Sequence, residues 1–303
     1  MVDRNFIRVK VPCSTSNLGS GFDTVSAALN LYLTLKVKKS KVAGLHWSFS
    51  GEVPQHNIIN DALRAALEYL DSPIPDLEIE VNNPIPLKRG LGSSGAAIIG
   101  GIRLGARLAE RELTSREILS LAYPLEGHPD NLAASLLGGW VISRVDGLFV
   151  GAERLPAKLQ ARYVVCIPEV EVSTSRAREI LPDGYRLQDV AFNLQRVSLL
   201  IHALSSGRSE LIREATQDKI HQNYRATLVP GMDRVLSLDR MPADIEKCVL
   251  GVTISGSGST VLAIVSGEED AIGKWLVDCF SEAGISSRFL VLELDDHGAV
   301  LLD

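Results

Sequence analysis

A glycine-rich segment between a short strand and a long helix limits what this chain can fold into. Residues 84–96 read PIPLKRGLGSSGA, after an alternating strand at 77–81 and before a helix expected over 93–111. Gly90, Gly92 and Gly95 match the spacing of a dinucleotide fingerprint, but two prolines separate them from the strand, which that fingerprint follows directly. The chain also lacks a Walker sequence and the HRD and DFG signatures of protein kinases. The open alternatives are a phosphate-binding loop and an ordinary loop before a capped helix.

The chemistry of this segment suits an anion. Backbone N–H groups and the positive end of the helix dipole attract phosphate, and Lys88 and Arg89 add positive charge. The Ser94 hydroxyl is of the kind that binds magnesium in other phosphate loops. The helix contains several glycines, each of which costs up to about 1 kcal/mol relative to alanine. We expect close packing of this helix against a sheet to compensate at Gly100, Gly101 and Gly105.

Three further polar segments are candidate sites. Residues 126–131, EGHPDN, place two carboxylates, an imidazole and an amide within six positions, so Glu126 or Asp130 could hold a metal or take a proton. The alternative there is a polar turn with Asp130 capping the next helix. The loop at 14–23 is rich in small residues that admit a ligand to the backbone. The ISGSGS segment at 254–259 is, by itself, a glycine hairpin.

Composition excludes several classes of protein. The chain has 303 residues, 46% of them apolar, which suits one or two cores, and its net charge of -6 argues against a nucleic-acid partner. Its cysteines are far apart and form no CxxC pair, so we expect buried thiols in a reducing compartment: Cys13, Cys166, Cys248 and Cys279. The N-terminus lacks an apolar signal, and the uncharged stretch 248–267 has the pattern of two strands joined by a glycine turn. We therefore expect a cytoplasmic protein with no membrane partner.

Periodicity predicts an α+β fold, because strands and helices mix without strict alternation. Alternating or apolar strands are expected at 6–11, 29–37, 77–81, 163–167, in a pair within 248–265, and as a final strand at 288–294. Helices are expected at 57–70, 93–111, 189–206, 208–218 and 268–284. The first has Asn57 as its N-cap and an apolar stripe at Ile58, Ala62, Ala65 and Leu70. We expect two domains, residues 1–150 and 151–303.

Taken together, the polar segments resemble the GHMP kinase superfamily of small-molecule kinases. The blocks PCSTSNLGSGFD, PIPLKRGLGSSGAA and ISGSGST occur in the family's order and at fitting distances. EGHPDN and the VSTSRAREILP stretch at 172–182 are most similar to the homoserine kinase family. The resemblance implies an N-terminal ATP-binding domain like ribosomal protein S5 domain 2, a ferredoxin-like C-terminal domain and often a homodimer. It also implies magnesium-dependent transfer of the γ-phosphoryl group of ATP to the side-chain hydroxyl of L-homoserine, a step of threonine biosynthesis.

The resemblance also assigns the nucleotide-binding residues. Magnesium goes to Ser94 and Glu126, and the adenine pocket includes Asn57 as a weaker candidate. The triphosphate goes to Pro86, Leu87, Lys88, Arg89, Gly90, Leu91, Gly92, Ser93, Ser94, Gly95 and Ala96. Gly95 stands where alanine is usual, and Ser259 stands where the last block usually has proline.

For the amino acid, a guanidinium fork suits a carboxylate, so the resemblance gives that end to Arg178 and Arg225. Asp23 and Asn17 suit the ammonium group, with His128 and Thr174 assisting. The reacting hydroxyl is expected near Asn131, Asp130 and Arg225. The general base stays unassigned, because mevalonate kinases carry an aspartate where Asp130 lies and homoserine kinases are thought to act without one. Two alternatives remain open: another GHMP kinase of the mevalonate or pantoate type, and a non-catalytic nucleotide-binding protein on this fold.

Overall fold

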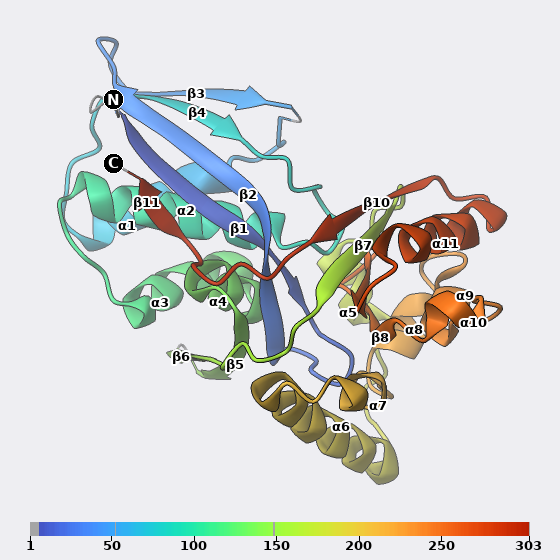
Figure 1. The fold of residues 1–303 in the computed structure, drawn as a ribbon. Helices are drawn as coiled ribbons and strands as arrows, with labels where there is room; N and C mark the ends of the chain where they lie inside the picture. Colours follow the sequence, from blue (N-terminus) through green and yellow to red (C-terminus); the bar gives the residue numbers. More distant parts are fainter. Residues whose placement is uncertain (1–5, 52, 148, 303) are drawn as a thin grey trace.

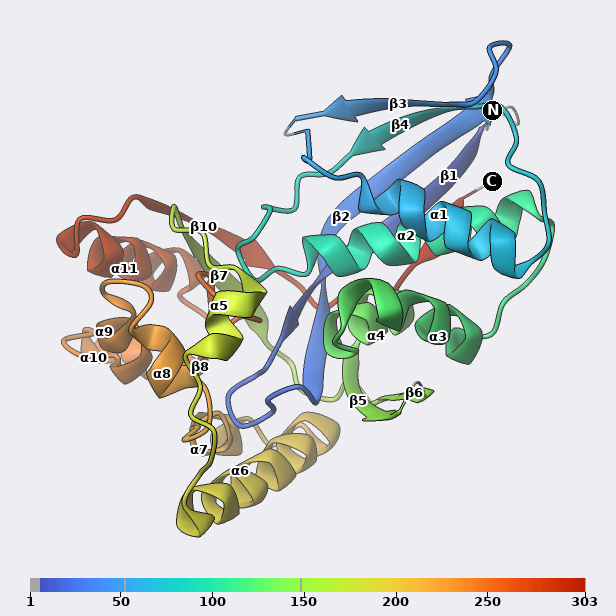
Figure 2. The same ribbon diagram turned by 180° about the vertical axis from the view of Figure 1, so that it is seen from behind.

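Two antiparallel-rich sheets organise the computed structural model, which describes residues 6–51, 53–147 and 149–302. The first sheet has the strand order β11-β1-β2-β4-β3, with β5 paired to β2 and β6 to β5. Its strands are β1 (Ile7–Ser16), β2 (Val25–Lys39), β3 (Leu45–Ser50), β4 (Leu77–Asn82), β5 (Trp140–Asp146), β6 (Phe149–Arg154) and β11 (Val300–Leu302). Figures 1 and 2 show α1 and α2 on the same face of this sheet. The helices of this half are α1 (Ile58–Tyr69), α2 (Ser93–Leu108), α3 (Ser115–Glu126) and α4 (Asp130–Leu137).

The second sheet is fully antiparallel and has the order β10-β7-β9-β8. Its strands are β7 (Arg162–Pro168), β8 (Val249–Ile254), β9 (Val261–Val265) and β10 (Ser287–Leu292). Among the helices of this half, α11 packs beside β7 and β10, and α6 lies apart from the second sheet (Figure 1). The helices of this half are α5 (Thr174–Glu179), α6 (Leu187–Ser206), the 3-10 turn η1 (Ser209–Leu211), α7 (Ile212–Ala215), α8 (Gln222–Ala226), α9 (Met232–Ser237), α10 (Ala243–Glu246) and α11 (Glu269–Glu282).

Helix α1 confirms its predicted start and corrects its predicted face. The Asn57 side chain accepts a hydrogen bond from the backbone N–H of Asn60, as an N-cap does. The buried side chains form a stripe that begins one residue later than expected: Ile59, Ala62, Leu63, Ala66 and Leu67. The predicted members Ile58, Ala65 and Leu70 are only partly buried. The buried face follows the helical i, i+3, i+4 spacing from Ile59 and leaves these three side chains at its edges.

The glycines of α2 confirm close packing, but the partner differs from the one expected. A Cβ on Gly101 would lie 2.5 Å from the carbonyl oxygen of Ile59, and one on Gly105 would lie 2.7 Å from the Ala66 Cβ. Both neighbours belong to α1, so these glycines let two helices approach each other. Only Gly100 faces the sheet, where a Cβ would meet Leu33 and Leu35 in ordinary contact. The expected packing against a sheet is therefore wrong for two of the three positions.

Several predicted boundaries change. Strand β1 continues through Cys13 to Ser16 after an irregularity at Pro12, so residues 14–16 of the expected polar loop belong to a strand. The helix expected at 208–218 is wrong: only η1 and the four-residue α7 form, and Asp218 then accepts the backbone N–H groups of Ile220, His221 and Gln222. The strand at 288–294 is not the last, because β11 follows and pairs with β1.

The expectation of buried, unpaired thiols is confirmed for Cys13, Cys166 and Cys279. The four cysteines are free, and only Cys248 is not fully buried. Within residues 6–51, 53–147 and 149–302, no helix combines the length and apolar character needed to cross a membrane. The division near residue 150 stays a prediction. Strand β11 returns from the chain's end to the sheet of the first half.

Candidate active site

One cleft brings together most of the residues predicted for the site. It is lined by the β1–β2 loop, the segment before α2, the start of α2, the α3–α4 connection, α5, α8 and the β8–β9 turn. The predicted residues that line it are Asn17, Asp23, Pro86, Lys88, Arg89, Gly90, Leu91, Gly92, Ser93, Ser94, Glu126, His128, Asp130, Asn131, Thr174, Arg178 and Arg225. A second cavity shares Lys88, Ser93 and Ser94 with the cleft and is lined also by Asn57 and Leu87. Gly95 and Ala96 line neither cavity, because both are buried within α2.

The start of α2 leaves its first backbone N–H groups without a side-chain cap. Gly92 is the N-cap residue, at a left-handed φ of 65°, and no side chain of the described residues caps the first turn. The structure thus gives no side-chain cap in support of the alternative, an ordinary loop before a capped helix. Uncapped N–H groups at the positive end of a 16-residue helix attract an anion. Lys88 and Arg89 lie 3.5 and 3.6 Å from Glu171, a residue that the sequence analysis missed.

The β8–β9 turn is a glycine hairpin, as expected, and it also supports the segment before α2. The Ser255 hydroxyl donates to the carbonyl oxygen of Gly90 at 2.6 Å, and the N–H of Thr260 donates to that of Arg89 at 3.2 Å. A Cβ on Gly90 would lie 2.1 Å from the Ser255 carbonyl oxygen, and Gly90 has a φ of 77°. The two glycine-rich blocks therefore fit against each other only when this position carries no side chain.

We expect Gly90→Ala to lower the melting temperature and to weaken the affinity for ATP about tenfold or more. The clash is with the backbone of Ser255, which cannot move away as a flexible side chain can. Differential scanning fluorimetry and ATP titration check this. Gly284→Ala is the matched control, since Gly284 has a φ of 78° and nothing lies within 4 Å of its Cβ position. Equal effects of the two substitutions would show that strain alone, and not the contact with the turn, explains the loss.

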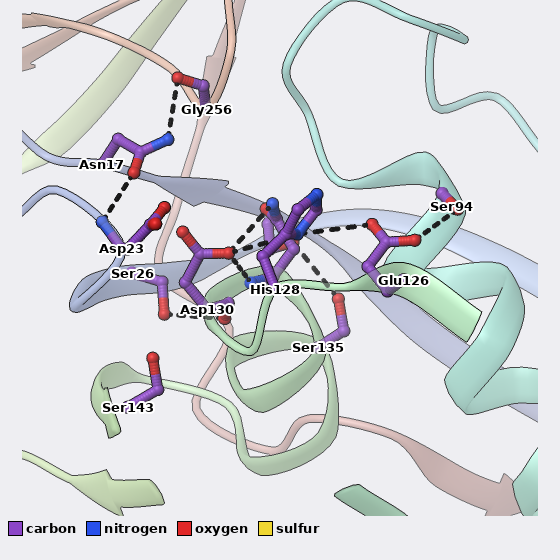
Figure 3. A network of polar contacts seen from close by, with 12 residues as sticks. Asn17, Asp23, Ser26, Ser94, Glu126, His128, Asp130, Ser135, Ser143 and Gly256 are labelled. Carbon is purple, nitrogen blue, oxygen red and sulfur yellow. Dashed lines mark hydrogen bonds and ion pairs between the residues drawn. The ribbon is translucent and has the colours of Figure 1, made fainter. Parts of the chain in front are cut away.

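Ser94 and Glu126 form the clearest candidate for metal binding (Figure 3). The Ser94 hydroxyl donates to a Glu126 carboxylate oxygen at 2.7 Å. Burial raises the pKa of Glu126, and this outweighs the opposing effects of His128 and of the Ser94 hydrogen bond. A cation at this point would compensate the buried carboxylate. Within the described parts of the chain, no three His, Cys, Asp or Glu residues gather as a metal cage. Two oxygen donors beside an anion site fit magnesium, which keeps waters and takes phosphate oxygens as ligands.

Asp130 is buried at the start of α4, close to His128 and Asn131. The N-cap of α4 is Pro129, so the predicted cap by Asp130 is wrong, and Asp130 instead accepts from the N–H of Asn131 at 2.7 Å. The Nδ1 atom of His128 lies 3.7 Å from Asp130 and 3.8 Å from Glu126, which is too far for a direct hydrogen bond. Asn131 is held by Ser14, whose hydroxyl donates to its Oδ1 at 3.0 Å.

Burial raises the pKa of Asp130 above that of an exposed aspartate, despite the lowering effect of His128. A carboxyl whose native pKa is raised favours folding most fully below the unfolded pKa, about 4, and that contribution is lost as pH rises toward the native value. We therefore expect Asp130→Asn to raise the melting temperature at pH 8, with a difference from wild type that shrinks as pH falls to 5. Thermal scans across this range check it. A pH-independent difference would contradict the assignment of the cost to the buried charge.

The residues predicted for the two ends of an amino acid lie together in the cleft. Arg178 donates to both oxygens of Asp23, each at 2.9 Å, in a bidentate ion pair. Arg225 is buried and donates to the carbonyl oxygens of Ala177 and Gly256 at 3.2 and 2.9 Å. Burial lowers the pKa of Arg225 to about 10, so it stays charged at neutral pH.

Asn17 makes hydrogen bonds within the protein, and Thr174 lies on the cleft wall. The Asn17 side chain accepts from the N–H of Asp23 at 2.8 Å and donates to Gly256 at 3.0 Å, so it ties the β1–β2 loop to the β8–β9 turn (Figure 3). Thr174 is the first residue of α5 and lies on the cleft wall. The sequence analysis missed Phe22, which stands beside Asp23 in the first block and contacts both arginines.

Two family models match this chain and define the class of protein. The model of the GHMP kinases N terminal domain matches residues 57–139, which include the segment before α2 and the α3–α4 connection. The model of the GHMP kinases C terminal domain matches residues 200–284, which include Arg225 and the β8–β9 turn. The fold is that of a two-domain GHMP kinase.

Relatives over the full length place the chain more narrowly. A homoserine kinase of Moorella thermoacetica is 39% identical over 298 residues, which cover 97% of this chain and 99% of that protein. One of Persephonella marina is 37% identical over 300 residues, or 97% of this chain and 98% of that protein. The solved homoserine kinase of Cytophaga hutchinsonii is 27% identical, with a TM-score of 0.86 and coverage of 100% of this chain and 99% of that one. The chain belongs to the homoserine kinase family.

Proposed function

We propose that this enzyme transfers the γ-phosphoryl group of ATP to the side-chain hydroxyl of L-homoserine, giving O-phospho-L-homoserine and ADP. The observation that carries the proposal is the division of the cleft into two chemically different ends. One end has an uncapped helix N-terminus and the Ser94–Glu126 oxygen pair. The other has the Asp23 carboxylate beside two guanidinium groups. A zwitterionic alcohol and a nucleotide triphosphate match these ends.

At the nucleotide end, the backbone N–H groups of Ser93 and Ser94 would bind phosphate oxygens, and the segment 86–92 would surround them. Ser94 and Glu126 would hold magnesium, which neutralises charge on the phosphates. The adjoining cavity, with Asn57 and Leu87 in its walls, suits the base and the ribose. Its apolar lining includes Leu33, Phe49 and Val81.

At the amino-acid end, Arg178 and Arg225 would bind the carboxylate and Asp23 the ammonium group. Asn17 would hold Asp23 in place through its backbone N–H, and His128 and Thr174 would contact the substrate from the walls. Asp130 lies between Asp23 and Glu126 in Figure 3, and the hydroxyl would meet the phosphate near Asp130 and its neighbour Asn131. Transfer of a phosphoryl group depends mainly on positioning and charge, so this arrangement is sufficient without an assigned base.

An assay of ADP release with magnesium-ATP tests the proposal. The acceptors are L-homoserine, mevalonate, pantoate, galactose and shikimate, each across a range of concentrations. We expect strong turnover with L-homoserine alone. Turnover with mevalonate or pantoate and none with homoserine would overturn the substrate, and ATP binding without turnover of any acceptor would favour a non-catalytic protein. The homodimer and the cytoplasmic location stay predictions, which analytical ultracentrifugation and cell fractionation check.

A further inference from the structure

The ring of Phe22 lies against both guanidinium groups of the amino-acid end. The Cζ of Arg225 lies 5.0 Å from the ring centroid, and the Cζ of Arg178 lies 5.7 Å from it. Phe22 is half-buried and directly precedes Asp23, whose carboxylate pairs with Arg178. One aromatic ring therefore contacts two cations that the fold brings from α5 and α8, 47 residues apart in sequence (178 to 225).

Phe22 is itself held by a buried histidine. The His221 ring is fully buried, and its centroid lies 5.3 Å from that of Phe22 at an angle of 30°. Burial lowers the pKa of His221 and keeps it neutral, with Asp218, Arg225 and Asp23 as the charged groups near it. The Nε2 atom lies 2.7 Å from the carbonyl oxygen of Gly19, to which the neutral ring donates.

The loop that carries Phe22 is fixed at two further points. A Cβ on Gly19, which has a φ of 54°, would lie 2.3 Å from the carbonyl oxygen of Thr216, so the two backbones are in close contact. The Ser20 hydroxyl donates to the carbonyl oxygen of Ala215 at 2.9 Å. The end of α7 thus holds the β1–β2 loop that carries Phe22.

Two guanidinium groups that bind one substrate carboxylate repel each other, and each needs N–H donors for that carboxylate. Asp23 compensates Arg178, whereas the hydrogen bonds described for Arg225 go to neutral carbonyl oxygens. An aromatic ring attracts a cation through its negative face without removing an N–H donor. Phe22 can therefore stabilise both cations without occupying any of their N–H donors.

We propose that Phe22 is a positioning residue that holds Arg178 and Arg225 together for the carboxylate of the amino-acid substrate. The inference rests on the proposed function. It adds a residue that acts through the two arginines and does not itself bind the substrate or take part in phosphoryl transfer.

Phe22→Leu and Phe22→Tyr test this role, because leucine keeps an apolar side chain without a ring and tyrosine keeps the ring. For Phe22→Leu we expect the KM for L-homoserine to rise about tenfold, with kcat and the KM for ATP changed less than twofold. Phe22→Tyr should stay within threefold of wild type. With 3-aminopropan-1-ol, which is homoserine without its carboxylate, kcat/KM should be the same in Phe22→Leu and wild type.

Thermal scans of both variants separate this role from a purely structural one. A lower kcat and higher KM values for both substrates together with a lower melting temperature, or an equal rise in the homoserine KM in the tyrosine variant, would overturn the proposal. So would a homoserine KM that does not change in Phe22→Leu. Wild-type turnover of homoserine is measured first, so a failure of the proposed substrate is distinguished from a failure of the role of Phe22.

Discussion

Glu126→Gln is expected to lower kcat about a thousandfold and to leave the KM for L-homoserine within threefold. The substitution removes the carboxylate charge that Ser94 contacts at 2.7 Å, and it changes the shape of the side chain little. Magnesium with one fewer anionic ligand would bind more weakly and would be less well placed on the phosphates. Its placement matters most in the transition state. Steady-state kinetics at increasing magnesium concentrations measure the effect.

Glu68→Gln, on the exposed face of α1, is the matched control and should keep wild-type kinetics. The magnesium dependence is the more specific readout. In the Glu126→Gln variant, half-maximal activity should need at least tenfold more magnesium than in wild type. A variant with a normal magnesium requirement and nearly normal kcat would remove Glu126 from the metal site. Because burial raises the pKa of Glu126, the same variant should lose no thermal stability in the absence of ligands.

Local patterns predicted the parts of the site in which neighbours in sequence are neighbours in space. The Asn57 cap, the helix start after Gly92 and the grouping of Glu126, His128 and Asp130 each depend on residues at most four positions apart. Such features follow from turn and helix geometry alone. The predicted apolar stripe of α1 was displaced by one residue, because apolar side chains occupy neighbouring positions there (Ile58 and Ile59, Ala65 and Ala66) and packing against α2 selects the buried set.

Long-range contacts were beyond the reach of such patterns. The bidentate pair of Asp23 and Arg178 joins residues 155 positions apart, and the contact between Gly90 and Ser255 spans 165. The resemblance to a family assigned Asp23 and Arg178 to the two ends of a substrate, but it did not show that they bind each other. The role of Phe22 depends on three partners from α5, α8 and the turn before α8, so no spacing in the sequence pointed to it.

The Asp23–Arg178 pair gives a reason for selecting a zwitterion. A substrate carboxylate that approaches Arg178 must compete with Asp23, which already accepts both of its hydrogen bonds at 2.9 Å. In the proposed arrangement, the ammonium group of the same substrate would then take the place of Arg178 at Asp23. A hydroxy acid without an ammonium group leaves the carboxylate of Asp23 without a partner, at a cost typical of an unpaired charge in a partly buried site.

Asp23→Asn is therefore expected to raise the KM for L-homoserine about a hundredfold, with a much smaller change in kcat. Asparagine is the appropriate replacement, because Asp23 has a left-handed φ of 51°, which asparagine tolerates better than alanine does. The control is Asp189→Asn, which removes an ion pair with Lys219 on the surface and should leave the kinetics unchanged.

The decisive comparison uses 4-hydroxybutanoate, which is homoserine without its ammonium group. In the Asp23→Asn variant Arg178 is no longer held by a carboxylate, so kcat/KM for this hydroxy acid should stay the same or rise while that for homoserine falls. The preference for homoserine should then drop about a hundredfold. An equal fall for both compounds would mean that Asp23 serves only to shape the loop, since a structural defect would not distinguish a substrate with an ammonium group from one without it.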